Sequence, residues 1–420
     1  MSQPTHFLDS NEAGVVVLGG GHAGASAVAA LRKFGYEGRI QLVSAEAALP
    51  YQRPPLSKEW LCADTNRADF EIRPASFYEK AGIELRLGAQ STAIDARSRK
   101  VVLDDGAELT YKHLVYALGA CPVVLKVPGA ELEGIVGLRD ATDAARLKRE
   151  LANAKHLVVL GGGYIGLEVA ASARRLGLQV TVIEKAPRVL ARVASPLLSH
   201  HFEHEHRQRG VRVLTNQGLA ACKGRGRIEA VVLDDGQEIE CDCLLVGIGV
   251  VPNDALARRA GLVCDSGVIV DGNCCSSDPA IFAIGDCATT RLAPGGELRR
   301  FESVPAANDQ ARRAAAAIAG KPVPAPETPW FWSDQYDIKL QMAGTTSRVD
   351  NCVLRGDPAS GRFAVFHLAG KSVKAVECVN DAAAFSFGKS LIADQTHVDL
   401  VRLADTNISL KSVVASHETT

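Results

Sequence analysis

The sequence predicts an α/β protein in which two Rossmann-like domains are nested, followed by a smaller α+β domain. A β-branched apolar run followed by G-x-G-x-x-G occurs twice, at residues 15–24 and at residues 157–166. Each copy leads into a helix-compatible segment and then a second strand, as in a βαβ unit. Beyond a proline-rich linker at residues 322–329, short alternating apolar segments at 330–332, 338–342 and 363–368 indicate a small mixed domain.

The two glycine motifs predict two dinucleotide sites. Their glycines are Gly19, Gly21 and Gly24 in the first copy and Gly161, Gly163 and Gly166 in the second. The first glycine of such a motif makes a tight turn, the second lets a pyrophosphate approach the backbone, and the third lets helix pack on strand. The helix N-terminus then offers unpaired N–H groups to phosphates. The chemical reason to hold two dinucleotides is hydride transfer, most simply between a nicotinamide and FAD.

An acidic residue follows the second strand of each unit. Glu46 lies just beyond the first such strand and Glu184 ends the other. A carboxylate in this position hydrogen-bonds ribose hydroxyls. Glu184 favours NADH, since a carboxylate repels a 2′-phosphate, whereas Lys185 and Arg188 nearby leave the alternative of NADPH open.

Further elements are predicted in matching order in the two halves. Strands are expected at 83–87, 100–103, 114–119, 231–233, 244–249 and 280–285, Asp-Asp-Gly turns at 104–106 and 234–236, and a helix at 306–319. The paired prolines before Leu56 exclude a helix start ahead of that residue and make a stiff platform for Arg53 and Lys58. Asp286 follows a strand ending in Gly285, where it can bond a polyol chain at the carboxyl edge of the sheet.

Composition limits the possible partners. A net charge of −1 over 420 residues gives no whole-chain reason to expect nucleic acid or an anionic membrane. No apolar run approaches the roughly 18 residues that span a bilayer. Residues 1–14 are polar and include Asp9 and Glu12, so we expect no targeting peptide. We therefore expect a cytoplasmic location.

Cysteine and histidine residues are the remaining candidates for metal or redox sites. The eleven cysteines include no C-x-x-C pair, and most are expected to be small, buried, reduced side chains. His200 and His204 lie one helical turn apart, as metal ligands can, but Glu203 and Glu205 suit a solvated helix face and no H-E-x-x-H motif is present. No metal site is expected.

With these residues in place, the chain resembles the FAD-dependent, NADH-using ferredoxin reductases of the putidaredoxin reductase type. The resemblance extends from residue 19 to about residue 392 and includes RPPLSK at 53–58, GGGYIGLEVAA at 161–171, GIGVVPN at 247–253, GDCA at 285–288, ESVP at 302–305 and WFWSDQY at 330–336. It implies a glutathione-reductase-like division into an FAD domain at 1–121 and 249–325, an NADH domain at 122–248 and a C-terminal domain at 326–420. It also implies that NADH reduces FAD, which passes single electrons to a two-iron two-sulfur ferredoxin serving a bacterial monooxygenase or dioxygenase.

The resemblance implies roles for individual residues. Lys58 and Glu168 resemble the ion pair next to the isoalloxazine, and Trp332, supported by Trp330, resembles the aromatic beside the flavin; simple domain packing is the alternative for either Trp. FAD contacts are implied for Gly19, Gly21, His22, Ala23, Gly24, Ala45, Glu46, Arg53, Lys58, Ser91, Ala117, Gly119, Arg139, Asp286, Val304 and Trp332. NAD contacts are implied for Gly161, Gly163, Tyr164, Ile165, Gly166, Glu184, Lys185 and Gly249.

Three positions depart from the family pattern. Ala45 stands where relatives often place the adenosine-ribose carboxylate, which leaves that task to Glu46 or to no residue. Ser91 replaces an aliphatic residue, and Cys121 replaces a frequent Arg, so one phosphate contact is in question.

Ferredoxins of this kind are acidic, so a locally basic docking face is expected. The candidate residues are Arg299, Arg300, Arg312, Arg313 and Lys339. Turnover with ferredoxin should then weaken as salt rises.

Four alternatives remain from the residues. A rubredoxin in place of ferredoxin is the nearest. An NADH oxidase of the same fold needs a single reactive Cys near the RPPLSK loop, where only Cys62 is close. A disulfide reductase needs two redox cysteines, which residues 53–58 do not carry. A flavin-carrying interaction protein like apoptosis-inducing factor needs a large basic surface or a targeting segment.

Overall fold

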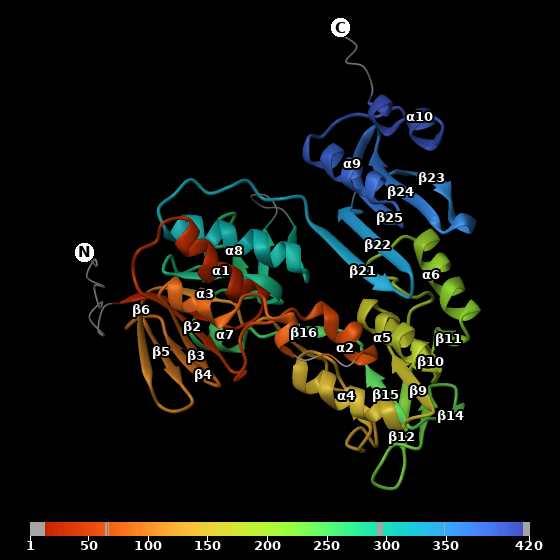
Figure 1. Cartoon of the computed structure of the whole chain (residues 1–420), viewed down its shortest axis with the longest axis horizontal. Helices are drawn as coiled ribbons and strands as arrows, with labels where there is room; N and C mark the ends of the chain where they lie inside the picture. Colours follow the sequence, from red (N-terminus) through yellow and green to blue (C-terminus); the bar gives the residue numbers. More distant parts are fainter. Residues whose placement is uncertain (1–12, 64, 66, 292–296, 348, 415–420) are drawn as a thin grey trace. The chain divides into compact units, whose positions relative to one another are not determined.

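The computed structural model describes residues 13–63, 65, 67–291, 297–347 and 349–414. Most of residues 1–14, for which no targeting peptide is expected, lie outside this set. The chain forms two compact units, each built from three segments. Unit 1 comprises Met1–Gln52, Arg67–Cys121 and Val251–Glu327; unit 2 comprises Arg53–Asn66, Pro122–Val250 and Thr328–Thr420. Figure 1 shows the helices and strands with the labels used below.

Unit 1 is organised around a parallel sheet in the order β3-β2-β1-β6-β18. Its strands are β1 (Gly14–Leu18), β2 (Ile40–Ser44), β3 (Ile83–Leu87), β6 (Glu108–Tyr116) and β18 (Ile281–Ala283). The first part of β6 also pairs antiparallel with β5 (Lys100–Leu103), which pairs with β4 (Ser91–Asp95). A three-stranded sheet consists of β17 (Val268–Val270), β19 (Ala288–Arg291) and β20 (Leu298–Arg300).

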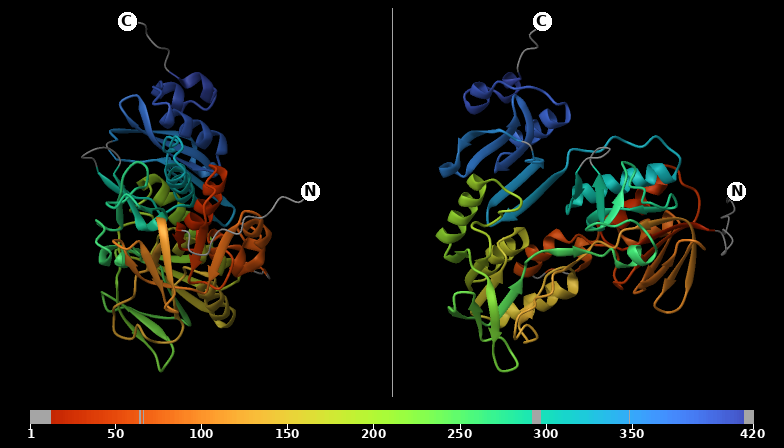
Figure 2. Two further views of the ribbon diagram at one scale, coloured as in Figure 1. Left: turned by 90° about the vertical axis from the view of Figure 1, so that its left-hand side faces the viewer. Right: turned by 180° about the vertical axis from the view of Figure 1, so that it is seen from behind.

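Helices of unit 1 cover the parallel sheet. They are α1 (His22–Lys33), α3 (Ala75–Lys80), α7 (Ala255–Arg259) and α8 (Val304–Ile318), with short 3-10 turns η2 (Arg67–Phe70) and η3 (Gly285–Cys287). The views of Figures 1 and 2 show α1 and α8 side by side. Small side chains such as Ala27, Ala311 and Ala315 are buried in the core that these two helices share with the sheet. Alanine at these positions lets two helix backbones approach closely.

Unit 2 contains a second parallel sheet, in the order β11-β10-β9-β15-β8. Its strands are β8 (Ile135–Val136), β9 (His156–Leu160), β10 (Gln179–Glu184), β11 (Val211–Thr215) and β15 (Cys243–Val246). The associated helices are α2 (Glu59–Cys62), α4 (Ala141–Asn153), α5 (Tyr164–Arg175) and α6 (Pro196–Gln208), with the 3-10 turn η1 (Pro54–Ser57). A small antiparallel sheet comprises β12 (Leu219–Lys223), β13 (Ala230–Leu233) and β14 (Glu238–Glu240). The short strands β7 (Ala120–Pro122) and β16 (Val250–Pro252) pair with each other, and the division of the chain into units falls within both.

The end of unit 2 is an antiparallel sheet in the order β21-β22-β25-β24-β23. Its strands are β21 (Trp330–Gln335), β22 (Ile338–Gly344), β23 (Asn351–Asp357), β24 (Arg362–Ala369) and β25 (Ser372–Val379). It is followed by α9 (Ala382–Ala393) and α10 (Leu400–Ala404), with the turns η4 (Pro358–Ser360) and η5 (Leu410–Val413). Figure 2 shows α9 against this sheet, where Phe385 and Leu391 are buried.

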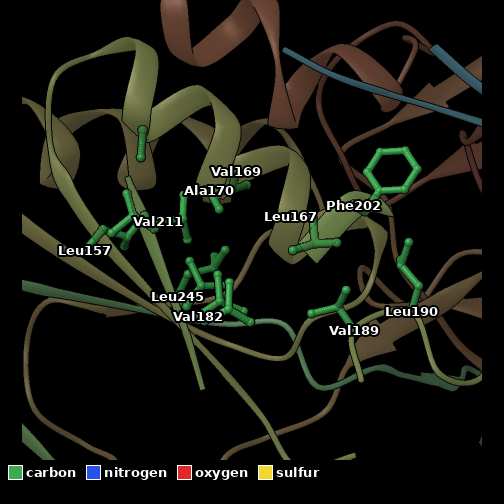
Figure 3. Close-up of a cluster of buried hydrophobic side chains, with 14 of the residues drawn as sticks. Leu157, Leu167, Val169, Ala170, Val182, Val189, Leu190, Phe202, Val211 and Leu245 are labelled. Atoms are coloured by element: carbon green, nitrogen blue, oxygen red, sulfur yellow. The ribbon is translucent and has the colours of Figure 1, made fainter. Parts of the chain in front are cut away.

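A continuous apolar core joins the two sheets of unit 2. Figure 3 shows Leu157, Val182 and Leu245 of the parallel sheet facing Leu167 and Ala170 of α5. The same cluster includes residues of the antiparallel sheet, namely Ile338, Leu340, Phe363, Val365 and Val379. Each fully buried side chain of this size contributes about 1.5–3 kcal/mol of transfer free energy. The antiparallel sheet is therefore packed on the nucleotide-binding type of fold and does not stand apart from it.

The predicted α/β architecture is confirmed, with several differences in detail. The strands expected at 244–249 and 280–285 end earlier, at Val246 and Ala283. The strand expected at 114–119 begins earlier and ends at Tyr116, because its first residues pair with β5 after the turn at Gly106. The strand β4 was not predicted, since its sequence STAID carries one large apolar residue. The exclusion of a helix start before Leu56 was wrong, since the 3-10 turn η1 begins at Pro54. Proline is tolerated at the first positions of such a turn, because the N–H that it lacks would have no partner there.

Candidate functional site

The first glycine motif forms the connection from β1 to α1 in unit 1. Gly19 has φ +113°, and a Cβ there would lie 2.2 Å from the carbonyl oxygen of Ala117. A Cβ at Gly24 would lie 1.9 Å from the oxygen of Gly19, so the first and third glycines are required by close backbone packing. Helix α1 follows Gly21 with no side chain capping its N-terminus. Its first N–H groups are therefore oriented as a phosphate site requires.

A cavity of about 410 Å³ lies at the start of α1. It is lined by His22, Ser26, Gln52, Ile72, Arg73, Val304 and Asn308. The Ser26 hydroxyl donates to Asn308 Oδ1 at 2.6 Å, which joins α1 to α8 at the cavity wall. The structure thus brings His22 and Val304, both expected at the FAD, to one cavity.

The remaining predicted FAD residues of unit 1 lie at the ends of its strands or in the loops that follow them. Ser91 starts β4 and is buried, and Ala117 and Gly119 follow β6, the latter with φ +66°. Asp286 lies in the turn η3 directly after β18, where the sequence places a polyol contact. The Glu46 carboxylate accepts a hydrogen bond from the Tyr51 hydroxyl at 2.5 Å. One oxygen of the Glu46 carboxylate is therefore already bonded within the protein, and Ala45 has no carboxylate to offer a ribose.

Other predicted FAD residues belong to unit 2. Arg53 donates from Nη1 to the carbonyl oxygen of Arg139 at 2.8 Å, so these two residues are in contact. Lys58 and Trp332 also belong to this unit. The predicted FAD set is thus divided between the two units.

The second glycine motif forms the connection from β9 to α5 in unit 2. A Cβ at Gly161, which has φ +109°, would lie 2.4 Å from the oxygen of Gly247, and one at Gly166 would lie 2.1 Å from the oxygen of Gly161. In contrast, a Cβ at Gly163 would meet no atom within 4 Å. Gly163 precedes α5 without a side-chain cap. Open space beside uncapped N–H groups suits a pyrophosphate, and protein packing alone gives no reason for a glycine at this position.

Glu184 closes this loop from the end of β10. Its Oε2 accepts the N–H of Gly162 at 2.7 Å and its Oε1 accepts the N–H of Ala186 at 2.7 Å. Each carboxylate oxygen keeps a second lone pair for a ribose hydroxyl. The neighbouring cation Arg188 donates to Ala191 and Ala194 within its own loop and to Ser199 of α6. These bonds hold its guanidinium in the protein and reduce its availability to a 2′-phosphate.

The Lys58–Glu168 pair is present and buried in unit 2. Lys58 Nζ lies 2.6 Å from Glu168 Oε2, and the side chains are 12% and 3% exposed. The turn η1 presents Lys58 at its end, and Lys58 Nζ also donates to the Pro54 carbonyl at 3.0 Å. A paired charge at such low exposure retains a strong field, because little water screens it.

Two serines missed in the sequence complete the surroundings of Glu168. The Ser57 hydroxyl donates to Oε2 at 2.5 Å and the Ser333 hydroxyl donates to Oε1 at 2.6 Å. Both serines lie inside motifs already noted, RPPLSK and WFWSDQY. Their place beside Lys58 and beside the paired tryptophans is the one signal in the sequence that could have singled them out.

The aromatic residues of β21 pack against neighbouring rings in tilted arrangements. The Trp330 and Trp332 ring centroids are 5.6 Å apart, and Trp330 also lies 5.6 Å from Phe385 of α9. Phe331 lies between these two tryptophans in the strand. Its ring contacts that of Tyr164, with the two centroids 4.3 Å apart. The Tyr164 hydroxyl donates to Met342 Sδ at 3.0 Å, and burial raises the pKa of Tyr164. These contacts fix the Tyr164 ring at the start of α5, next to the exposed Ile165, and the NAD contact expected of Tyr164 stays a prediction.

The basic docking face expected from the sequence needs one correction. Arg313 is 6% exposed and pairs with Asp309 of its own helix, so it cannot meet a partner protein. Arg299, Arg300 and Arg312 are more exposed, and each has an acidic partner: Glu297, Glu302, and Asp309 with Glu327. Lys339 on β22 is exposed. The wrong expectation for Arg313 arose because a buried i, i+4 ion pair looks the same in sequence as a solvated one.

Cysteine and membrane features can be stated for the described residues. All eleven cysteines are free thiols; Cys121 and Cys352 are exposed, and six are buried. Cys62, next to the RPPLSK loop, donates weakly to the Ser172 carbonyl. None of the helices in residues 13–414, as far as these are described, is long and apolar enough to cross a membrane.

The two loops fit FAD and NAD. Each provides an uncapped helix N-terminus after a glycine turn, and a carboxylate lies beyond the following strand. The open space at Gly163 and the cavity at His22 supply room beside these N-termini. The N–H groups can donate to phosphates and the carboxylates can accept from ribose hydroxyls.

Comparison with known families and proteins agrees with these features. Residues 13–311 match the family described as pyridine nucleotide-disulphide oxidoreductase, and residues 330–414 match a reductase C-terminal domain. The chain is 42% identical to the probable ferredoxin reductase CtmF of Castellaniella defragrans over 97% of this chain and 100% of that protein. It is 40% identical to a rubredoxin-NAD(+) reductase of Pseudomonas putida over 87% and 95% of the two chains.

A solved structure gives the same answer for the fold. The reductase in the covalent putidaredoxin reductase–putidaredoxin complex aligns with a TM-score of 0.92 and 38% identity, covering 96% of this chain and 98% of that chain. The near-complete coverage and the high TM-score agree with the fold and the two glycine loops described above. The chain belongs to the pyridine nucleotide-disulphide oxidoreductase family and, within it, to the ferredoxin reductases of the putidaredoxin reductase type.

Proposed function

We propose that this protein is an NADH-dependent FAD oxidoreductase that reduces a two-iron two-sulfur ferredoxin of a bacterial monooxygenase or dioxygenase system. The observation that carries the proposal is the buried Lys58–Glu168 pair in a chain with two complete dinucleotide loops. Bound FAD supplies the conversion of one hydride equivalent from NADH into two single electrons and one released proton. The protein contributes binding, orientation and electrostatics.

The first loop, residues 19–24, holds the FAD pyrophosphate on the N–H groups of α1, and Asp286 binds the ribityl chain. Val304 and His22 line the cavity beside α1. Ser91, Ala117, Gly119, Arg53 and Arg139 contribute backbone or side-chain contacts to FAD. These assignments follow from the family resemblance, and the positions described above support them.

The second loop, residues 161–166, holds the NADH pyrophosphate on the N–H groups of α5. Glu184 binds the adenosine ribose, with Ile165, Lys185 and Gly249 completing the contacts. Lys58 acts as a fixed positive charge that stabilises negative charge on the flavin ring as NADH reduces it. Glu168 keeps the Lys58 ammonium oriented, and Trp332 borders the flavin on the side of the electron acceptor.

The proposal is tested by anaerobic titration of the purified flavoprotein with NADH, followed by cytochrome c reduction with or without a two-iron ferredoxin. NADH should bleach the flavin absorbance, and cytochrome c should be reduced rapidly only when ferredoxin is present. Rapid reoxidation by oxygen or a disulfide without ferredoxin dependence would contradict the proposal.

Rubredoxin is the second candidate acceptor, because one relative is named a rubredoxin-NAD(+) reductase. Parallel assays with purified rubredoxin and ferredoxin at equal concentrations separate the two. We expect a higher kcat/KM for ferredoxin; a higher value for rubredoxin would assign the chain to that acceptor.

Salt dependence tests the electrostatic part of the docking proposal. Lys339 is the candidate most clearly available to an acidic partner, since its ammonium is on an exposed strand position. We expect kcat/KM for ferredoxin to fall roughly tenfold between low and moderate ionic strength, and Lys339→Ala to flatten that dependence. The control is Lys371→Ala, which removes an exposed charge from the turn between β24 and β25 and should leave the salt dependence unchanged. A wild-type kcat/KM that does not respond to salt would remove the electrostatic docking proposal.

A further inference from the structure

A chain of buried polar groups extends from Glu168 away from Lys58. The Ser333 hydroxyl donates to Glu168 Oε1 at 2.6 Å, and Gln335 Nε2 donates to Ser333 Oγ at 3.2 Å. His206 Nε2 lies 2.9 Å from Gln335 Oε1, and the Tyr336 hydroxyl lies 3.2 Å from His206 Nδ1. The chain joins α5, β21 and α6, all in unit 2 and all labelled in Figure 1.

All members of this chain except the half-buried Tyr336 are shielded from water. Ser333 and His206 are 0% exposed, and Gln335 is 1% exposed. Polar groups buried to this degree are costly unless each one has a hydrogen-bond partner. Ser333, Gln335 and His206 each have a partner on both sides, so the network is continuous from Glu168 to Tyr336.

The direction of the hydrogen bonds follows from counting protons. Ser333 has one hydroxyl proton, and the Glu168 carboxylate can only accept, so that proton goes to Glu168. Gln335 must then present its amide nitrogen to Ser333 and its oxygen to His206. His206 consequently carries its proton on Nε2 and accepts from the Tyr336 hydroxyl at Nδ1.

The neutral form of His206 agrees with this arrangement. Burial lowers the pKa of His206 to about 4, although its bond to Gln335 raises the pKa in part. A neutral imidazole donates once and accepts once, which is what the chain requires at this point. All four donors therefore point toward Glu168 and stabilise its negative charge.

This polarity argues against a proton exit path. The reaction releases one proton per NADH, and an exit would need each group to donate outward. All groups donate inward, and the Gln335 amide cannot exchange protons as a hydroxyl or imidazole can. The chain is suited to fixing a charge.

The outer end of the chain is anchored by a strained residue. Tyr336 has φ +57°, a left-handed conformation that bulky residues rarely adopt. Arg209 lies over its ring at 4.7 Å from the centroid, and Arg175 donates to its carbonyl oxygen. Arg209 is itself held by Glu205 and Asp337. The protein thus keeps Tyr336 against His206 in spite of an unfavourable backbone.

We propose that Ser333, Gln335 and His206 are positioning residues that hold the Glu168 carboxylate, and through it the Lys58 ammonium, in place for reduction of FAD by NADH. The inference rests on the proposed function for the role of Lys58. It assigns a task to the polar residues of the WFWSDQY segment, which the aromatic residues alone do not explain.

The decisive variant is Gln335→Glu in the FAD-loaded full-length protein. The change keeps the size of the side chain but replaces the amide donor by a second acceptor, so Ser333 can no longer be held as a donor to Glu168 alone. We expect the rate constant for anaerobic flavin reduction by NADH to fall about tenfold, with the Kd for NADH unchanged. The midpoint potential of the bound flavin should fall as well, because Lys58 is held less firmly.

The matched control is Gln208→Glu. Gln208 also bonds a histidine, His204, at 2.8 Å, but on the exposed side of α6 and without a link to Glu168. This control should leave the rate constant, the potential and the melting temperature unchanged. Ser333→Ala, which removes the donor next to Glu168, should reproduce the effect of Gln335→Glu if that variant is too unstable to study.

A readout independent of the flavin is the tautomer of His206. Nitrogen-15 NMR of histidine-labelled protein should show a neutral ring protonated on Nε2 near neutral pH. A proton on Nδ1, or an imidazolium, would overturn the assigned direction of the chain.

The failure of this inference is distinguishable from the failure of the proposed function. A folded Gln335→Glu protein that reduces its flavin at the wild-type rate, while Lys58→Met is slow, overturns the positioning role alone. A wild-type rate in Lys58→Met overturns both the role of Lys58 and the inference that depends on it.

Discussion

Glu168 shows how a single residue in this protein is specified by its surroundings. Its carboxylate is nearly inaccessible to water, yet Lys58, Ser57 and Ser333 all donate to it. Removing one partner of a buried pair leaves an uncompensated charge, which costs more than the pair contributes over an apolar substitute. The pair is therefore better explained by the field it exerts than by stability.

The first prediction concerns Lys58→Met. We expect the rate constant for flavin reduction by NADH to fall about 100-fold, because a preorganised charge is lost, and the free energy of unfolding to fall by about 3 kcal/mol, because Glu168 stays buried. Stopped-flow absorbance and urea unfolding measure the two effects. Lys100→Met is the control, since Lys100 pairs with Glu108 at the surface and should change neither quantity measurably.

The second prediction concerns Glu184, whose two oxygens each accept a backbone N–H. Glu184→Ala should raise the KM for NADH about tenfold, since a charge-assisted bond to ribose is lost. NADPH should gain little, because Arg188 stays bound within its own loop. Steady-state kinetics with both nucleotides measure this, with the exposed Glu240→Ala as control; efficient use of NADPH by Glu184→Ala would contradict the role given to Arg188.

At the scale of elements, glycine meets two different requirements in the strand-to-helix connections. One is close backbone packing, and the other is open space beside the helix N-terminus. Gly161 and Gly166 are needed because the backbones of loop, strand and helix approach closely. Gly163 is extended, with φ −82°, and its missing Cβ faces open space. One glycine of the motif is therefore free of any packing requirement within the protein.

The third prediction separates these requirements. Gly166→Ala should lower the free energy of unfolding by about 3 kcal/mol, since its Cβ would lie 2.1 Å from the Gly161 oxygen. Gly163→Ala should leave thermal stability unchanged but weaken NADH binding, because the methyl group occupies the space proposed for the pyrophosphate. Calorimetric melting and NADH titration distinguish the two, and a destabilised Gly163→Ala would show that this glycine serves packing as well.

At the scale of the whole molecule, the eleven cysteines are distributed by exposure. Burial raises the pKa of Cys241, Cys243, Cys274 and Cys287 to about 12, whereas Cys121 and Cys352 are exposed. A raised pKa means that less thiolate, the reactive form, exists at a given pH. The buried thiols are thus small core side chains that do not react in the native state.

The fourth prediction is a thiol titration. In the native protein near pH 8, an aromatic disulfide reagent should modify Cys121 and Cys352 quickly, and the buried cysteines only after denaturation. Because the buried thiols ionise only in the unfolded chain between about pH 9 and pH 12, the free energy of unfolding should decrease as pH rises through that window. Double replacement of the two exposed cysteines by Ser is the control. Cys62, Cys264 and Cys275 are half-buried and should react more slowly, and rapid native modification of any of the six buried cysteines would contradict the assigned burial.

Much of the fold could be predicted because its signals are local. Alternating or β-branched runs, glycine turns and an Ala-rich helix specify elements over a few residues, and both nucleotide loops lie where the motifs place them. Strand β4 and the turn at Pro54 were missed because short polar strands and 3-10 turns carry weak local signals. The three-domain boundaries and the contacts assigned to individual cofactor residues remain predictions.

The sequence by itself determined the two nucleotide loops, the family and the residues of the Lys58–Glu168 pair. Only the tertiary structure decided what surrounds that pair, since Ser333 and Glu168 are 165 residues apart in the chain. It also decided that Arg313 is buried with Asp309, and that the polar residues of β21 face α5 and α6. The physical reason is that a side chain's burial and partners depend on the packing of distant segments, whereas turns and helix starts depend on neighbouring residues.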